Sequence, residues 1–350
     1  MLFSPRVRLC FALLLLCVPC LVPSGAAAQG SNEKPKIGFL LDSLKIERWQ
    51  TDLNSFQKRA QELGAEVVFE DADGNDDVMF KQAKKMLDQH VKALVLVPHD
   101  TDKAVRIVEL AKSKGVPVVS YDRLIRNSDI DFFVGVDTVS IGETQAKALL
   151  AVAPKGNYVL LEGSPTDINA HMMLEGQKKG LKQSVDNGDI KIVAELWCPD
   201  WKPLEAYTRL AEVIAKNRGQ IAAVVASNDG TAGGAVQALE ENKLDGKVAV
   251  SGQDADLAAI IRILKGTQTM TVYKPLASLA AQAADSAFAL ATGKQPSATG
   301  SIENGKHSVP AIFGPVVAVN KSNIKDTVIK DGFQNIDTIR RSLPPDQWPK

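Results

Sequence analysis

The sequence predicts an α/β fold made of two doubly wound parallel-sheet lobes, each Rossmann-like. Short, almost uniformly apolar segments alternate with longer amphipathic segments along most of the chain, a pattern typical of parallel strands covered by helices on both faces. The alternation restarts after "DFFVGVD", residues 131–137, so two units of similar size are expected with a boundary near Asp137. A chain of 350 residues with 45% hydrophobic residues is long enough for two cores.

The first unit begins at "KIGFLLD", residues 36–42, whose apolar run predicts a buried strand. The next segment, 47–64, has apolar residues at helical spacing and ends at Gly64, so it predicts a helix. By the same criteria, strands are expected at 65–73, 93–98, 116–122 and 131–137, and helices at 77–90 and 103–115.

The second unit repeats the pattern. Its helices are expected at 140–153, 170–185, 204–217 and 231–242. Its strands are expected at 157–164, 191–197, 222–229 and 247–254, and a further strand at 268–275. Gly233 and Gly234 are expected to allow close packing of the helix that contains them.

The N-terminus has the features of a secretory signal peptide. Arg6 and Arg8 precede an apolar stretch at 9–22, and small residues offer a cleavage site after Ala28. Residues 1–28 are therefore expected to be removed on export to the periplasm, although an uncleaved membrane anchor is an alternative. Of the four cysteines, only Cys198 lies outside this leader, so no internal disulfide is expected.

Composition and motifs argue against several functions. The 41 basic and 41 acidic residues balance, which argues against a nucleic-acid-binding surface. The chain lacks a G-x-S-x-G elbow, a Walker loop and a G-x-G-x-x-G turn after a strand. "DADGNDD" (71–77) resembles a calcium loop but lacks the glycine and glutamate that such a loop requires. No metal, cofactor or enzymatic activity is expected.

Polar side chains follow the predicted strands at the point where each strand ends. Carboxyl ends of parallel strands meet at one edge of a sheet, where ligands bind. The residues singled out at these ends, two of them tryptophans, are Asp42, Glu47, Arg48, Trp49, Asp122, Arg123, Asp167, Asn169, Trp201, Asn228, Asp229, Gln253, Asp254, Asp256 and Lys274. Together they predict a binding site between the two lobes.

The chemistry of these residues favours a neutral polyhydroxylated ligand. Carboxylates accept, Arg and Lys donate, and Asn does both, which suits hydroxyl groups that donate and accept at once. Trp49 and Trp201 could sandwich the C–H faces of a sugar ring. Taken singly, Asp122 and Arg123 could instead be a surface ion pair, Trp49 a core residue and Asn228 a helix cap. Their shared position at strand ends favours the binding site.

Seven long stretches resemble the periplasmic sugar-binding proteins of ABC importers, which have the type I periplasmic binding protein fold. They are "IERWQTD" (46–52), "YDRLI" (121–125), "GSPTDINA" (163–170), "VVASNDGTAGGA" (224–235), "SGQDADLAAI" (251–260), "GTQTMTVYKP" (266–275) and "NIKDTVIKDGF" (323–333). The resemblance covers residues 36–333, and the tail beyond Phe333 departs from it.

The resemblance implies two lobes joined by three hinge strands. The N-terminal lobe is expected to comprise 34–137 and 275–308, and the C-terminal lobe 138–274 and 309–345. Helix 276–293 would then pack on the first lobe. The chain would return to the first lobe near Lys274 and to the second near Val309.

The resemblance also implies the ligand and the residues that bind it. The positions match the pattern of family members that bind D-xylose, and "YDRLI" also fits binders of glucose, galactose or arabinose. The implied sugar-binding residues are Arg48, Trp49, Asp122, Arg123, Asn169, Trp201, Asn228, Asp254 and Lys274. The expected partners are a monosaccharide and a membrane ABC permease, with the protein itself a monomer.

Three other functions compete with a transport receptor. A sugar-responsive transcription regulator would need a helix-turn-helix where the predicted leader stands. An isomerase or hydrolase could use Asp122 and Asp254 as an acid–base pair, but Arg48, Arg123 and Lys274 would hold both carboxylates ionised. A role with a chemotaxis or sensor partner is compatible with transport and stays open.

Overall fold

The computed structural model describes residue 1 and residues 34–46 and 48–349. The predicted signal peptide at 1–28 lies, apart from Met1, outside the described residues, as does Glu47 of the "ERW" segment. None of the described helices has the length and apolarity required to span a bilayer. Residues Lys34–Lys350 form one compact unit.

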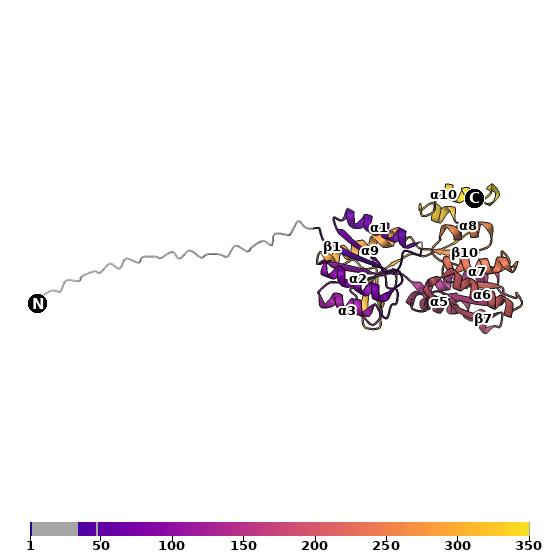
Figure 1. Cartoon of the computed structure of the whole chain (residues 1–350), viewed down its shortest axis with the longest axis horizontal. Coiled ribbons are helices and arrows are strands. Elements are labelled where there is room, and N and C mark those ends of the chain that lie inside the picture. Colours follow the sequence, from indigo (N-terminus) through magenta and orange to yellow (C-terminus); the bar gives the residue numbers. More distant parts are fainter. Residues whose placement is uncertain (2–33, 47, 350) are drawn as a thin grey trace. The chain divides into compact units, whose positions relative to one another are not determined.

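The first lobe is built on a seven-stranded sheet with the order β11-β12-β5-β4-β3-β1-β2. Figure 1 shows this lobe at the end of the molecule that carries β1. Its strands are β1 (Lys36–Leu41), β2 (Glu66–Asp71), β3 (Ala93–Leu96), β4 (Val118–Tyr121), β5 (Phe132–Val136), β11 (Gly300–Glu303) and β12 (Ser308–Gly314). All neighbours pair in parallel except β11, which runs antiparallel to β12 at the sheet edge. The apolar strands are buried on both faces, as the sequence predicts for a covered parallel sheet.

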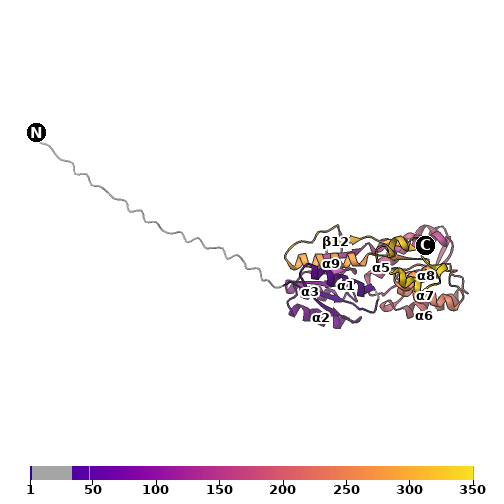
Figure 2. The same cartoon turned by 90° about the horizontal axis from the view of Figure 1, so that it is seen from above.

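Two pairs of helices cover this sheet. They are α1 (Arg48–Glu62) with α9 (Leu276–Ala291), and α2 (Asp76–Asp88) with α3 (Val105–Ser113). Helix α9 packs against α1 and against five strands of the first sheet, and the two helices lie side by side from above (Figure 2). The expectation that segment 276–293 packs on the first lobe is therefore confirmed.

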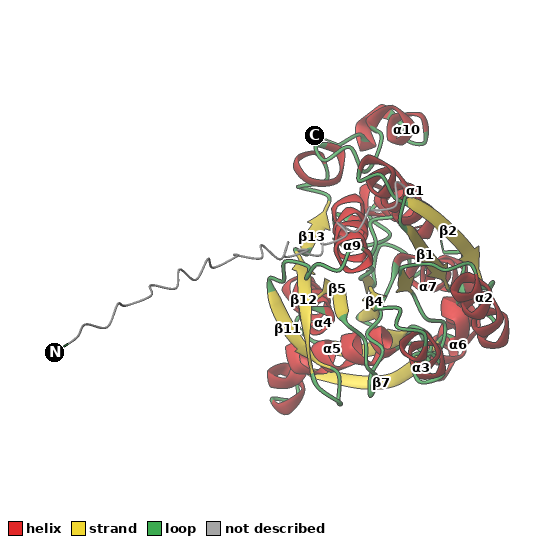
Figure 3. Cartoon of the chain, turned by 90° about the vertical axis from the view of Figure 1, so that its left-hand side faces the viewer, coloured by secondary structure: helices red, strands yellow, loops and turns green. Residues whose placement is uncertain are grey.

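The second lobe has a four-stranded parallel sheet with the order β7-β6-β8-β9. Its strands are β6 (Gly156–Glu162), β7 (Ile190–Trp197), β8 (Ala223–Ala226) and β9 (Ala249–Val250). Its helices are α4 (Thr138–Val152), α5 (Ile168–Asp186), α6 (Pro203–Lys216), α7 (Asp229–Glu241) and α8 (Leu257–Lys265). Figure 3 distinguishes the helices from the strands by colour, and the predicted two-lobed α/β fold is confirmed.

The chain passes between the sheets three times. It leaves the first sheet after β5, returns after β10 (Met270–Tyr273), and leaves again after β12. Beyond the third passage, β13 (Val317–Asn320) pairs antiparallel with β10, and a short helix α10 (Ile336–Arg341) follows.

The structure corrects the expected third passage at Val309. Strand β12 pairs with β5 from Ala311 to Gly314 and with β11 on its other side, so residues 309–314 belong to the first sheet and not to the second lobe. The backbone hydrogen bonds of this ladder hold the chain in the first lobe until Gly314. We keep the other predicted lobe boundaries, at 137/138 and 274/275, as a proposal.

Candidate functional site

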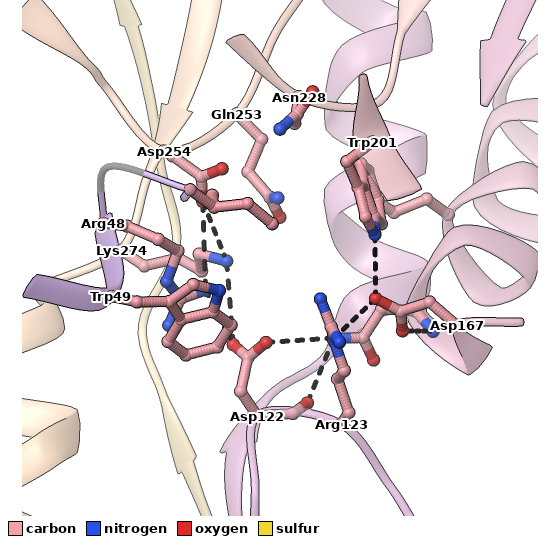
Figure 4. A pocket seen from close by; sticks show the side chains of 13 residues that line it. Arg48, Trp49, Asp122, Arg123, Asp167, Trp201, Asn228, Gln253, Asp254 and Lys274 are labelled. Carbon is pink, nitrogen blue, oxygen red and sulfur yellow. Dashed lines mark hydrogen bonds and ion pairs between the residues drawn. The ribbon is translucent and has the colours of Figure 1, made fainter. Parts of the chain in front are cut away.

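A cavity with about 320 Å³ of empty space lies between the two lobes (Figure 4). The structure brings all nine sequence-predicted residues together around it. The lining residues are Ile46, Arg48, Trp49, Asp122, Arg123, Asp167, Asn169, Met173, Trp201, Asn228, Gln253, Asp254 and Lys274. Most are polar or charged, yet nearly all are withdrawn from solvent.

The topology explains why residues so far apart in sequence meet here. Arg48 and Trp49 open α1 after β1, and Asp122 and Arg123 directly follow β4. In the second lobe, the segments that follow β6, β7, β8 and β9 carry the remaining polar groups, with Asn169 in the first turn of α5. Lys274 follows β10. Each group therefore lies beyond the carboxyl end of a strand, where open α/β sheets bind ligands.

Asp122 is a buried carboxylate surrounded by cations. Its Oδ1 accepts a hydrogen bond from Arg48 Nη1 at 2.8 Å and lies 3.8 Å from Lys274 Nζ. Burial by itself raises the pKa of Asp122, but Arg48, Lys274 and Arg123 together outweigh burial and hold that pKa at about 2. The carboxylate stays charged at neutral pH and can accept hydrogen bonds from a ligand.

Arg123 connects the lobes through two carboxylates. Its guanidinium donates to Asp42 Oδ2 at 2.7 Å and to the carbonyl of Pro98 at 2.6 Å. Across the cavity, its Nε lies 2.6 Å from Asp167 Oδ2. Burial raises the pKa of Asp167, and Arg123 only partly offsets that effect. The opposite charges of Arg123 and of its two carboxylate partners offset part of the free-energy cost of burying each of them.

Arg48 and Lys274 are held by further carboxylates. Arg48 donates to Asp52 Oδ1 at 3.0 Å as well as to Asp122. Lys274 Nζ lies 3.2 Å from Asp254 Oδ1. Opposite charges thus alternate along the wall of the cavity, and a polar ligand meets donors and acceptors whose positions are already fixed.

The two tryptophans lie on opposite sides of the cavity in Figure 4. The Trp49 ring has the Arg48 guanidinium 4.1 Å from its centroid and meets Tyr121 edge-on. Trp201 donates its indole N–H to Asp167 at 3.1 Å. Its ring can lie there because Gly163 has no side chain; a Cβ at that position would come within 2.2 Å of the indole.

Backbone strain accompanies three of these residues. Asp122, Trp201 and Asp254 have φ of 62°, 57° and 102°, values that L-residues rarely adopt. Such conformations cost of order 1–3 kcal/mol each and persist where the surroundings fix them, often at ligand sites.

Asp229 fixes the loop that carries Asp254. Its carboxylate accepts from Thr271 Oγ1 and Gln268 Nε2, each at 2.8 Å, and from the backbone N–H of Asp256 at 3.0 Å. Burial raises the pKa of Asp229 to about 7, against the opposing charge of Arg262. Asn228, one residue earlier, caps α7 through its side-chain oxygen and also lines the cavity. The helix-cap interpretation is therefore confirmed, and the role of Asn228 as a sugar ligand stays a prediction.

Four lining residues were absent from the nine predicted sugar-binding residues. The strand-end rule included Asp167 and Gln253 in the predicted binding site, but the resemblance did not name them as sugar-binding residues. Ile46 and Met173 are apolar and lie in or beside helical segments, where the sequence does not distinguish them from core residues. In the described part of the chain, no group of three or more His, Cys, Asp or Glu is arranged to hold a metal ion.

Comparisons with known proteins agree with this geometry. Residues 37–295 match the family described as periplasmic binding protein domain. The chain is 47% identical to the D-xylose-binding periplasmic protein of Escherichia coli K12, over 92% of this chain and 96% of that one. It is 44% identical to the protein of the same name from Haemophilus influenzae, over 89% and 94%. A solved carbohydrate transporter solute-binding protein from Chloroflexus aurantiacus, in complex with D-glucose, is 28% identical with a TM-score of 0.82, covering 87% of this chain and 98% of that chain.

Proposed function

The chain belongs to the periplasmic binding protein family, and from this we propose that it is the D-xylose receptor of an ABC-type sugar importer. The observation that carries the proposal is the cavity between the lobes, where fixed donors and acceptors surround a space flanked by two indole rings. Like the relatives that it matches, it is a binding protein and not an enzyme. The protein is located in the periplasm, and the predicted signal peptide at 1–28 would direct its export there.

The nine predicted residues supply partners for every part of a pyranose. Asp122 and Asp254 would accept from hydroxyls, and Arg48, Arg123 and Lys274 would donate to them. Asn169 and Asn228 would do both. Trp49 and Trp201 would stack on the two faces of the ring. The burial and pairing of these side chains support the assignment, because charge-assisted hydrogen bonds are strongest in a dry cavity.

The choice of D-xylose rests on the degree of similarity. The relatives named for D-xylose are 44–47% identical, whereas two named as multiple sugar-binding proteins, from Rhizobium radiobacter and Azospirillum brasilense, are 27–29% identical. Glucose, galactose and arabinose remain the alternative ligands.

Contacts across the cavity support binding by hinge closure. Asn169 of the second lobe donates to the backbone oxygen of Asp122 at 3.1 Å and to its Oδ2 at 3.2 Å, and Arg123 pairs with Asp167. These contacts can form only when the lobes meet, so a sugar that bridges both walls would shift the molecule toward this closed arrangement. A monomer would then present both lobes to a membrane permease.

Calorimetric titration of the mature chain with D-xylose, D-ribose, L-arabinose, D-glucose and D-galactose tests the proposal. We expect one D-xylose per chain and binding of the other sugars at least about tenfold weaker, because each misplaced hydroxyl leaves a buried group unpaired. Tighter binding of a hexose would reassign the sugar, and no response to any sugar would refute the receptor.

A pair of variants links that response to the site. Trp201→Leu removes one stacking face and should abolish measurable D-xylose binding and the accompanying change in tryptophan fluorescence. Trp348→Leu is the matched control, because Trp348 lies outside the cavity and bonds to carbonyls near the C-terminus. Equal binding by both variants would show that the site is wrongly placed.

A further inference from the structure

A second cavity adjoins the candidate site and also opens between the lobes. It has about 820 Å³ of empty space and shares Ile46, Arg123 and Trp201 with the first cavity. His99, which follows β3, lies on its wall and is mostly buried, with 14% of its side chain exposed. The binding site described above leaves this residue without a role.

His99 lies between carboxylates of opposite lobes. Its Nδ1 lies 2.9 Å from Asp42 Oδ1, at the end of β1 in the first lobe. Its Nε2 lies 3.8 Å from Asp200 Oδ1, in the loop between β7 and α6 of the second lobe. Asp42 in turn accepts from Arg123, and Asp200 immediately precedes Trp201. The imidazole therefore connects the supports of two candidate sugar contacts.

The charges around His99 favour its protonated form. The hydrogen bond with Asp42 raises the pKa of His99, and the negative charges of Asp42 and Asp76 raise it further. Burial and the positive charge of Arg123 lower it. The net effect is a pKa above the usual value of 6.5. Lys202 lies 2.6 Å from the other oxygen of Asp200. Lys45 and Asp73, which pair at 2.6 Å, complete the charged groups on this cavity.

We propose that His99 is a positioning residue that couples sugar binding to proton uptake, its imidazolium joining Asp42 to Asp200 when the lobes close. The proposal rests on the proposed function, because it concerns closure of that same site. His99 acts through Arg123, by way of Asp42, and through the loop that carries Trp201.

The direction of the coupling follows from which contacts depend on closure. Asp42 and His99 belong to the same lobe, so their hydrogen bond can persist when the lobes separate. Asp200 approaches His99 only in the closed arrangement, and an imidazolium is attracted to it more strongly than a neutral ring. The closed form therefore holds the proton more tightly. D-xylose should bind more tightly as the pH falls through the pKa of His99, and sugar binding should raise that pKa by the same linkage.

The size of the effect is modest because Asp200 is partly exposed. Its side chain is 46% exposed, and exposed ion pairs usually contribute little. We expect the D-xylose dissociation constant to fall roughly two- to fivefold between pH 9 and pH 6 through this contact.

The experiment measures D-xylose affinity by calorimetry across pH 6–9 and the titration of the His99 ring by NMR, with and without the sugar. The chain has four histidines, and His99→Gln identifies the signal. Asp200→Asn removes only the second-lobe charge, and Asn tolerates the φ of 56° at this position. Asp73→Asn is the matched control: Asp73 also has positive φ, at 52°, and lines the same cavity, but its partner is Lys45.

Asp229 also titrates near neutral pH, so the contribution of His99 is the difference between the wild type and the variants. The proposal is supported if D-xylose raises the pKa of His99, if His99→Gln and Asp200→Asn lose the slope, and if Asp73→Asn keeps it. Binding of D-xylose with an unchanged His99 titration, or an unchanged slope in Asp200→Asn, would overturn this inference alone. Absence of D-xylose binding at every pH would overturn the proposed function, and this inference with it.

Discussion

Asp122 and Arg123 are adjacent in sequence, yet each is paired with other residues. Asp122 contacts Arg48, and Arg123 contacts Asp42 and Asp167. The alternative interpretation, a local surface ion pair, is wrong because both side chains are buried. The left-handed backbone at Asp122 turns the two side chains toward different partners. Sequence alone showed that charges follow this strand, but only the fold decides which charges meet.

Replacing Asp122 by Asn tests how much the charge of this carboxylate contributes to stability and to D-xylose binding. Asn keeps the shape and tolerates positive φ, but it leaves Arg48 and Lys274 short of one buried counter-charge. Breaking a buried pair costs about 3 kcal/mol, so we expect a loss of about that size in unfolding free energy and about 100-fold weaker D-xylose binding. Urea unfolding and calorimetry at pH 7 measure the two effects. Asp186→Asn, at an exposed i,i+4 pair with Lys182, should change neither.

The same variant should alter stability in acid. Because the pKa of Asp122 falls from 3.8 to about 2 on folding, its charge contributes about 2 kcal/mol of stability above pH 4. That contribution disappears as the pH falls from 4 through 2. The wild type should therefore lose about 2 kcal/mol more than Asp122→Asn over this window. Parallel acid limbs in the two proteins would contradict the assigned charge.

Helices α4 and α5 approach each other closely through two glycines. A Cβ on Gly142 would lie 2.0 Å from the carbonyl oxygen of Met173, and one on Gly176 would lie 1.9 Å from that of Val139. Helix α5 brings Asn169 to the cavity at its first turn, so the helix contact positions a candidate sugar ligand. Gly234 plays a similar part against Pro203 in α6, as predicted for that segment, whereas Gly233 faces Arg262.

Gly176→Ala should force the two helices apart. Overpacking of this kind costs about 1–3 kcal/mol, and the shift of α5 should weaken D-xylose binding by displacing Asn169. Gly230→Ala is the control, because Gly230 is also helical and a Cβ there would meet nothing closer than 3.5 Å. Thermal unfolding and calorimetry distinguish the two. Equal stability of both variants would show that α4 and α5 adjust freely.

At the scale of elements, periodicity predicted the strands and helices that surround the site. Its errors have physical causes. The strand expected at 247–254 shortens to Ala249–Val250, because the following residues turn into the loop that carries Asp254. Helix α8 (Leu257–Lys265) was not predicted, because no element was expected between the strands at 247–254 and 268–275. Strand β12 depends on pairing with β5, a contact that local sequence does not reveal.

At the scale of the whole molecule, the strand-end rule predicted that polar residues from both lobes meet at one site, and most of the residues that it names line the cavity. Asp42, Asp229 and Asp256, which the rule also names, do not line it. The rule could not find Ile46 or Met173, whose apolar side chains satisfy a core and a cavity wall equally well. Nor could it find the interlobe contact of His99, which depends on the distance between lobes. The rule predicts at which edge of a sheet a side chain lies. Which side chains of the two lobes then contact each other depends on how the lobes are placed in the folded protein.

Beneath the site, the second lobe buries a carboxyl group that affects the stability of the whole molecule. Glu162, at the end of β6, is fully buried, and its Oε2 accepts from Ser227 Oγ at 2.7 Å. Gln177 donates to the same hydroxyl at 3.3 Å and to Gln145 Oε1 at 3.1 Å. Burial raises the pKa of Glu162 to about 8, so the folded protein holds this group protonated at neutral pH.

Glu162→Gln should therefore make the protein more stable in mild alkali. Below pH 4.5 both folded and unfolded chains carry the proton, so the group has no effect on the balance between them. As the pH rises toward 8, the unfolded chain releases its proton while the folded chain keeps it, and the wild type loses up to about 5 kcal/mol. Glutamine has nearly the same shape and no proton to release, so urea unfolding at pH 5 and 8.5 should show a smaller loss in the variant. Glu212→Gln, on the exposed face of α6, should follow the wild type. The same alkaline loss in Glu162→Gln would mean that Glu162 ionises in the folded state, and the cause would then lie with the other buried acid, Asp229, whose pKa is about 7.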